Sequence, residues 1–264
     1  EIFKNVKYGP AIDAMTFNNV VVTNNDFYDT AAAVYAKGST GVINNNHIYS
    51  SATDIYGGRL RLEDSDFVVG NNTIDDSVLS AISVAGGNAT IFKNNITKVY
   101  GDNGGTGIGI YNASDVNVYE NTLTNINKYG IFVENCMGNV KNIRKNNITA
   151  IASPLDSSHG IYVKDSGSNA IVEENTVSGF YYATTFDGTS GTIVNNTFDS
   201  SKFIGIQAVR NCNPVTIDNN TSSNTNSDNN NSSAIVVKTS SATIQDNTIN
   251  NAYGYGIRID ENSQ

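Results

Sequence analysis

Residues that can move protons or hold an anion gather between positions 129 and 210 of this chain. Lys164, Tyr162 and His159 carry groups that can act as general base or general acid, and Arg210 carries a guanidinium, which pairs well with carboxylates. Rings and acids around them suit a sugar polymer, because a tyrosine ring has a flat apolar face and a polar tip. These substrate-binding candidates are Tyr129, Phe132, Glu134, Asp165, Asp187 and Tyr111.

The same side chains could instead be ordinary partners in a sheet. Glu134 and Lys164 are expected as neighbours on adjacent strands, as are Asp187 and Arg210, and opposite charges there stabilise a sheet modestly. A histidine in a loop, such as His159, is often a plain surface residue. The sequence leaves binding and simple pairing open.

The elements that position these residues come from a repeat. One short phrase recurs ten times, with its asparagines 21 to 29 residues apart. It consists of an aliphatic residue, two further residues, an asparagine, one residue and usually another apolar residue. Such a period indicates repeats that must stack to bury their apolar residues. The asparagines are Asn25, Asn46, Asn72, Asn94, Asn121, Asn146, Asn175, Asn196, Asn220 and Asn247. We expect them to form a hydrogen-bonded ladder at a sharp corner, where asparagine tolerates left-handed backbone.

A second phrase precedes each asparagine phrase. It consists of a small residue, an aliphatic, any residue, and a small or aliphatic one, as at 130–133 and 160–163. Alternation with period two and β-branched residues predicts short strands. No repeat holds a helical pattern long enough for a crossover helix, so each repeat is expected to contain two or three short strands.

This pattern resembles the right-handed parallel β-helix repeats of the pectin-lyase-like superfamily, from about Pro10 to Asp260. The resemblance implies an all-β fold, a single-stranded right-handed parallel β-helix (solenoid) of about eleven coils. We expect one domain over residues 1–264, as a fragment of a longer exported protein.

Many members of that superfamily cleave or epimerise acidic polysaccharides. Lyases among them remove a proton beside a uronate carboxylate while a cation neutralises that carboxylate. The resemblance therefore implies Lys164, His159 and Tyr162 as base and acid, with Arg210 near the carboxylate. The signatures of the polygalacturonase hydrolases do not occur as a set, since Asp75-Asp76 stands without its partners.

The strand phrase also predicts which side chains share the outer surface. With the small residue as position zero, positions two and four point outward and position five begins a turn. For the coils starting at Gly130, Gly160, Tyr182 and Gly205, the expected outward columns are Phe132, Tyr162, Thr184, Gln207 and Glu134, Lys164, Phe186, Val209. The expected turn column is Asn135, Asp165, Asp187, Arg210, with Tyr129, His159 and Tyr181 just before the strands. Tyr35, Lys37, Tyr56 and Tyr111 are expected to extend this patch toward the N-terminal end.

Three repeats carry longer inserts, all after the asparagine phrase, following Asn94, Asn146 and Asn220. Long loops on a rigid scaffold commonly carry function, although surface insertions also drift at little cost. A groove walled by the 97–106 and 149–159 loops would favour catalysis, and a flat, fully paired surface would favour a structural spacer.

Composition limits the classes of partner that this protein can bind. A formal net charge of −9 and a pI of about 4.6 argue against nucleic acid, because phosphate binding needs a basic face. No apolar run is long enough for a membrane span. A surface rich in Asn, Ser and Thr fits an extracellular or cell-surface location. Cys136 and Cys212 are expected three coils apart, too far for a disulfide, as buried free thiols.

No metal site is expected from the sequence. Transition-metal clusters need grouped His and Cys, and these are missing from the sequence. Calcium is the one cofactor left open, through Asp102 with Asn103 or Asp165 with Asp187, although calcium needs six or more oxygens.

The leading functional hypothesis is an extracellular polysaccharide-active protein, of lyase type, that acts on a uronate-containing glycan. The rival hypothesis is a non-catalytic cell-surface adhesin or envelope structural repeat protein. The missing catalytic signature favours the adhesin, and the loops and the aromatic patch favour the enzyme.

Overall fold

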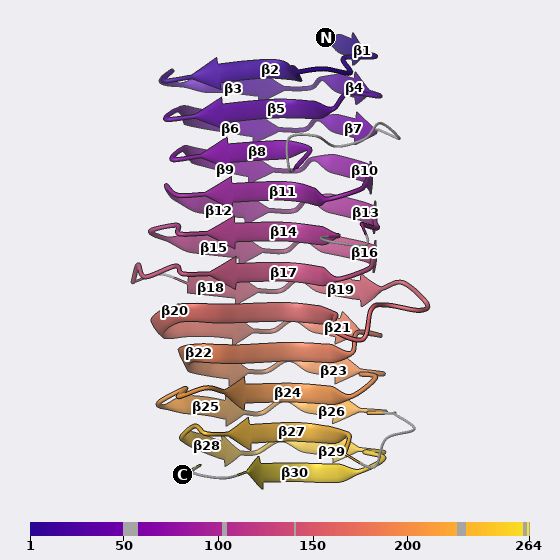
Figure 1. The fold of residues 1–264 in the computed structure, drawn as a ribbon, viewed down its shortest axis with the longest axis vertical. Coiled ribbons are helices and arrows are strands. Elements are labelled where there is room, and N and C mark those ends of the chain that lie inside the picture. Colours follow the sequence, from indigo (N-terminus) through magenta and orange to yellow (C-terminus); the bar gives the residue numbers. More distant parts are fainter. Residues whose placement is uncertain (50–57, 102–104, 140, 226–230, 261–262, 264) are drawn as a thin grey trace.

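A computed structural model shows how these repeats pack (Figure 1). It describes residues 1–49, 58–101, 105–139, 141–225, 231–260 and 263. Two of the expectations above, Tyr56 in the patch and the Asp102–Asn103 calcium pair, lie outside the described residues. Among those described, no helix has the length and apolar character needed to span a membrane.

The chain winds into a parallel β-helix with three strands in most coils (Figure 1). Every pairing joins a strand to its counterpart one coil away, and all are parallel. The described residues form ten complete coils between the single strands β1 and β30. The predicted fold class is thereby confirmed.

The three strands of a coil define three faces. Face 1 contains β2 (Pro10–Met15), β5 (Ala32–Lys37), β8 (Leu60–Glu63), β11 (Ser80–Ala85), β14 (Thr106–Tyr111), β17 (Tyr129–Glu134), β24 (Ile204–Val209), β27 (Ser233–Lys238) and β30 (Tyr255–Asp260). Face 2 contains β3 (Val20–Thr23), β6 (Thr40–Asn44), β9 (Asp66–Gly70), β12 (Ala89–Phe92), β15 (Val116–Tyr119), β18 (Lys141–Arg144), β25 (Val215–Asp218) and β28 (Ala242–Gln245). Face 3 contains β1 (Ile2–Lys4), β4 (Asp26–Tyr28), β7 (His47–Tyr49), β10 (Thr73–Ser77), β13 (Asn95–Val99), β16 (Thr122–Ile126), β19 (Asn147–Ala150), β21 (Thr176–Ser178), β23 (Thr197–Asp199), β26 (Thr221–Ser223) and β29 (Thr248–Asn250).

Two strands are longer than the sequence predicts. β20 (His159–Glu173) and β22 (Tyr182–Val194) run through the corner between faces 1 and 2 without a break. They join the two faces into one sheet, while face 3 remains a separate sheet.

The corner between faces 2 and 3 holds the asparagine ladder, as predicted. The Nδ2 of Asn146 donates to the Oδ1 of Asn175 at 2.9 Å, and its own Oδ1 accepts from the Nδ2 of Asn121 at 3.0 Å. The same Nδ2 reaches the carbonyl of Val118 at 3.0 Å, so the buried amide is fully used. The ladder runs through all ten asparagines from Asn25 to Asn247.

The left-handed residue at this corner is not the ladder asparagine. It is the residue before it, for example Lys93, Glu120, Lys145 and Glu174, each with φ between 51° and 57°. The ladder asparagine is held by its hydrogen bonds within the stack, and its own backbone is not left-handed, which corrects part of the expectation.

The two cysteines belong to a second polar column, at the corner after face 1. The backbone N–H of Cys136 donates to the Oγ of Ser166 at 3.1 Å, and that of Cys212 donates to the Oγ of Ser240 at 3.2 Å. Both thiols are free and buried, as predicted. Burial raises the pKa of both thiols, which keeps them protonated and unreactive.

Inward-facing aliphatics fill the interior of the coils. In one coil Ile131 and Val133 from face 1, Ile143 from face 2 and Ile148 from face 3 are all at most 1% exposed. Because inward and outward positions alternate along each strand, this packing leaves every second side chain free to vary outside.

Candidate functional site

The candidate residues lie on the outside of face 1, on five successive strands from β14 to β24. The register aligns Tyr129 with His159 and Tyr182, and it aligns Glu134 with Lys164 and Asp187. Arg210 lies in the turn after β24, whereas Asp165, expected in a turn, lies within β20 at the corner between faces 1 and 2, with φ at 46°. The fold thus gathers the candidate side chains on one stretch of surface.

One coil is out of register with the sequence-based columns. The small residue that aligns with Gly160 is Ala183, one position later than the Tyr182 taken from the sequence. Consequently Thr185 and Asp187 point outward, whereas Thr184 and Phe186, expected outside, are fully buried. Asp187 therefore lies on the strand and not in the turn column.

The aromatic rings form a continuous array along face 1. Phe132 stacks on Tyr129 with ring centroids 4.9 Å apart, and it meets Tyr111 and Tyr162 at 5.6 and 5.2 Å. His159 lies between Tyr162 and Tyr182 at 4.4 and 4.6 Å, with ring planes within 16° of parallel.

Three rings extend the array, namely Tyr181, which was expected in the patch, and Tyr182 and Phe203, which were not. Tyr182 contacts Phe203 at 5.9 Å, and Tyr181 stacks on Phe203 at 5.2 Å. The signal in the sequence is the run Phe180-Tyr181-Tyr182, which was assigned one position out of register.

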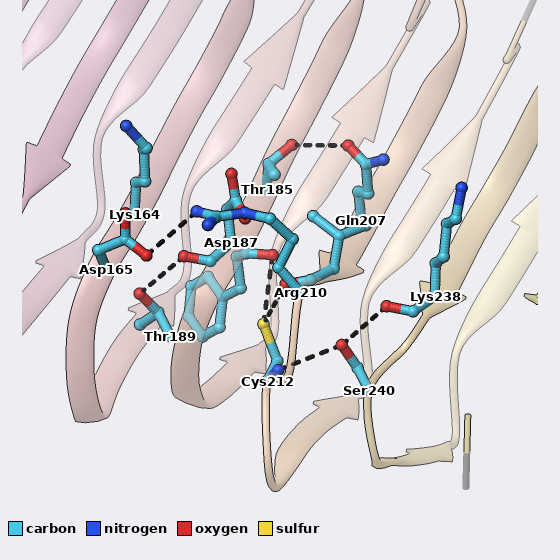
Figure 2. A network of polar contacts seen from close by, with 12 residues as sticks. Lys164, Asp165, Thr185, Asp187, Thr189, Gln207, Arg210, Cys212, Lys238 and Ser240 are labelled. Atoms are coloured by element: carbon cyan, nitrogen blue, oxygen red, sulfur yellow. Dashed lines mark hydrogen bonds and ion pairs between the residues drawn. The ribbon is translucent and has the colours of Figure 1, made fainter. Parts of the chain in front are cut away.

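A carboxylate holds the charged part of the site together. Asp187 Oδ2 accepts the Tyr162 hydroxyl at 2.6 Å, and Asp187 Oδ1 is paired with the Nε of Arg210. Arg210 also reaches Asp165, which lies two coils earlier, with Nη2 to Oδ1 at 3.1 Å (Figure 2). Lys164 forms an ion pair with Glu134 on the preceding coil.

These pairings move the pKa values of the candidate acids and bases. The hydrogen bond from Lys164 to Glu134 raises the pKa of the lysine, and that from Arg210 to Asp187 raises the pKa of the arginine. Burial and then the bond to Asp187 raise the pKa of the Tyr162 phenol far above its usual range. Lys164 and Tyr162 are therefore held protonated at neutral pH, the opposite of what a general base requires.

His159 is buried within the aromatic array. Its side chain is enclosed by two rings, and Nδ1 lies 2.9 Å from the carbonyl oxygen of Ser157. Burial lowers the pKa of His159 to about 4. The neutral imidazole is thus a weak base at neutral pH, and the nearby rings hold it in place.

The arrangement around Asp165 and Asp187 leaves no room for a calcium ion between them in this conformation, because the Arg210 guanidinium binds both carboxylates. Within the described part of the chain, no three or more His, Cys, Asp or Glu side chains group closely enough to hold a metal ion.

A loop borders the site, and a depression lies on a neighbouring part of the surface. Residues 151–158 link β19 to β20 and project from the edge of face 1, as Figure 1 shows. This depression of about 320 Å³ lies past the corner between faces 1 and 2 and is lined by Ala170, Ile171, Thr192 and Pro214 among others. None of the candidate site residues lines it.

A smaller cluster of the same kind lies near the N-terminal end of face 1. The Tyr35 hydroxyl donates to Glu63 Oε2 at 2.9 Å, and Glu63 also pairs with Arg61 and Lys37. Burial acts to raise the pKa of Glu63, but the bonds from Tyr35 and Arg61 outweigh it and lower that pKa. Tyr35 and Lys37 were expected to extend the main patch, whereas they form a separate cluster.

The comparisons with known proteins bear on the fold. The family described as the right-handed β-helix region matches residues 2–121 and 106–264. This chain belongs to the right-handed β-helix family. No curated protein matches its sequence. Among solved structures, this β-helix is similar to the surface protein and adhesin PfbA of Streptococcus pneumoniae, at 13% identity and a TM-score of 0.44, covering 98% of this chain and 84% of that one.

Proposed function

We propose that this β-helix is an extracellular, non-catalytic binding module that holds an acidic polysaccharide on face 1. The observation that carries the proposal is the continuous aromatic array from Tyr111 to Phe203, bordered by Arg210 and Lys164. Sugar rings pack on aromatic faces, while cations bind the carboxylates of uronate sugars.

The exposure of the charged groups supports an anionic ligand. Arg210 is 54% exposed, whereas its partner Asp187 is 11% exposed. An approaching polymer meets the guanidinium first, and the carboxylate beneath it holds the guanidinium in place. Arg210 also binds Asp165, which is 39% exposed, so a ligand carboxylate competes with Asp165 for the guanidinium.

The titration behaviour supports binding over catalysis. Lys164 and Tyr162 stay protonated, and His159 is a weak, buried base. A binding module needs fixed donors and rings, and both are present without a free general base.

The test is equilibrium binding of the full chain to polygalacturonate, alginate and a neutral glucan, measured by calorimetry. We expect the two uronate polymers to bind and the neutral glucan to bind weakly. Arg210→Gln should weaken uronate binding about tenfold, since a charge-assisted bond contributes about 1.5–3 kcal/mol. Lys145→Gln is the matched control, because Lys145 is an exposed, ion-paired cation away from face 1. Equal binding of all three polymers, or no loss in Arg210→Gln, would contradict the proposal.

A lyase of the type implied by the family resemblance is the second candidate. One observation favours it, namely that Tyr162 and Arg210 meet at the same carboxylate, Asp187. A substrate carboxylate that displaced Asp187 would face both a phenol and a guanidinium. Ultraviolet absorbance of the unsaturated product, measured with each uronate polymer, tests this directly. A steady rise that Tyr162→Phe abolishes would replace the binding proposal with the lyase.

A further inference from the structure

Two clusters on face 1 share one design. In the first, Tyr35 and Lys37 on β5 lie against Glu63 on the next coil. In the second, Tyr162 on β20 lies against Asp187 on the next coil. Both contain the spacing Tyr-x-Lys, and in both the lysine is the register partner of the acid.

The hydrogen bonding is also shared. In each cluster the tyrosine hydroxyl donates to the carboxylate, at 2.9 Å on Glu63 and 2.6 Å on Asp187. In each, an arginine Nε donates to the other oxygen of the same carboxylate, from Arg61 at 2.8 Å and from Arg210. The clusters differ in that Arg61 lies on the strand and Arg210 in a turn.

Each cluster places its cations above a shielded acid. Glu63 is 17% exposed, while Lys37 and Arg61 above it are 48% and 38% exposed. The same gradient separates Asp187 from Arg210. Both clusters therefore present a cation to an anion that approaches from solvent, while the phenol proton is donated to the acid beneath.

The surface between the clusters is low. The outward positions on β11 and β14 are Ser83, Ala85 and Gly109, followed by Tyr111. At Gly109 a Cβ would lie 3.0 Å from the Tyr111 ring, so glycine allows that ring to lie close to the sheet. Small side chains therefore leave the surface low beside the first cluster, and the rings of Tyr111 and Phe132 continue from there to the second.

The spacing of the clusters follows from the coils. Five coil steps separate β5 from β20, through β8, β11, β14 and β17. At roughly 4.8 Å per step the clusters are about 24 Å apart along the axis of the β-helix.

We propose that the two clusters are paired anchor sites for a single linear acidic polysaccharide that runs along face 1. The inference rests on the proposed binding function and adds a second site to it. Once one anchor is occupied, the other sees the same polymer at high effective concentration, so two weak contacts give tight binding. Shorter chains engage one cluster at a time.

The experiment measures the affinity of the full chain for a size series of oligogalacturonates. Affinity should rise roughly 100-fold at the length that first spans about 24 Å. Arg61→Gln should abolish that rise and leave one short chain bound per protein at the other cluster. Lys37→Gln, at a second exposed cation of the same cluster, should reduce the rise in the same direction. Lys145→Gln should leave the series unchanged, and urea unfolding confirms that each variant is folded.

Two outcomes overturn the inference, and they differ in what they say of the proposed function. Smooth length dependence, with Arg61→Gln equal to the wild type and Arg210→Gln strongly weakened, leaves a single site and retains the proposed function. Absence of binding at every length overturns both.

Discussion

Face 1 and face 3 are built on the same core, yet their outer surfaces differ in kind. Face 1 between β14 and β24 carries rings and ion pairs that engage one another. Face 3 from β13 to β29 carries mostly Thr, Ser and Asn at its outward positions, with one acid, Asp199.

The inward positions of the two faces are alike, since Ile131 on face 1 and Ile148 on face 3 are both fully buried. The coil therefore tolerates either outer surface. The difference teaches that large paired side chains are not needed to form the β-helix, which supports a role for them in contacts with a ligand.

The largest effect is expected at the ladder that both faces rest on. Asn146→Ala removes an amide that is 1% exposed and leaves the Asn121 side chain without its acceptor. Unpaired buried groups cost about 1–3 kcal/mol each, so we expect a loss of about 4 kcal/mol in unfolding free energy. Urea denaturation followed by circular dichroism measures it.

Asn147→Ala is the matched control for that change. Asn147 is the next residue, and its side chain points outward from face 3. We expect a change within about 0.5 kcal/mol, as for most surface substitutions. Similar losses for the two variants would show that the ladder is not special.

The next effect is the pH dependence that the burial of His159 gives to stability. Burial holds the pKa of His159 at about 4, against about 6.5 in an unfolded chain, so the unfolded state binds more protons between these values. Stability is complete at neutral pH, falls as the pH drops below about 6.5, and has lost about 3 kcal/mol near pH 4. His159→Phe keeps the ring stack and should remove this component from the difference between pH 7 and pH 4.5.

His47→Gln is the control on face 3, where the side chain is 45% exposed. This variant should retain the loss of stability between pH 7 and pH 4.5 that His159→Phe removes. If His159→Phe also followed the wild type, the enclosure of His159 by the aromatic array would be refuted.

The smallest effect compares two aspartates. Asp187→Asn on face 1 weakens the bonds to Tyr162 and Arg210 and should lower the unfolding free energy by about 2 kcal/mol, as for bonds to a charged group. Asp199→Asn on face 3 should change it by about 0.5 kcal/mol, because Asp199 accepts only solvent-exposed bonds from Asn224 and Ser200. Thermal unfolding of the two variants side by side gives the comparison, and equal shifts would remove the distinction between the faces.

Much of the fold could be predicted because it depends on short-range patterns. The asparagine period and the alternation of small and aliphatic residues are read within about ten residues, and they led to the coils, the ladder and the buried cysteines. Tyr111, Tyr129 and Phe132 were also expected on one face and do lie together.

The site was harder to predict because its partners are far apart in the chain. Tyr162 and Asp187 are 25 residues apart, and Arg210 lies 23 beyond Asp187. Tyr182 was taken as the small residue where the structure has Ala183. This one-residue error predicted Asp187 in the turn, although it lies on the strand, and predicted Phe186 outside, although it is buried. Side-chain alternation makes such an error reverse inside and outside for a whole strand.

The sequence by itself determined the β-helix, the asparagine ladder and the general position of the charged and aromatic residues, because periodic burial requires only the local order of residue types. The tertiary structure alone decided which charges meet and how they titrate. Coil lengths vary from one repeat to the next, so register across coils depends on packing, and the pKa of His159 depends on its enclosure between Tyr162 of its own strand and Tyr182 of the next coil. Face 1 is chemically distinctive in its composition, but only folding pairs its carboxylates with the groups that hold them.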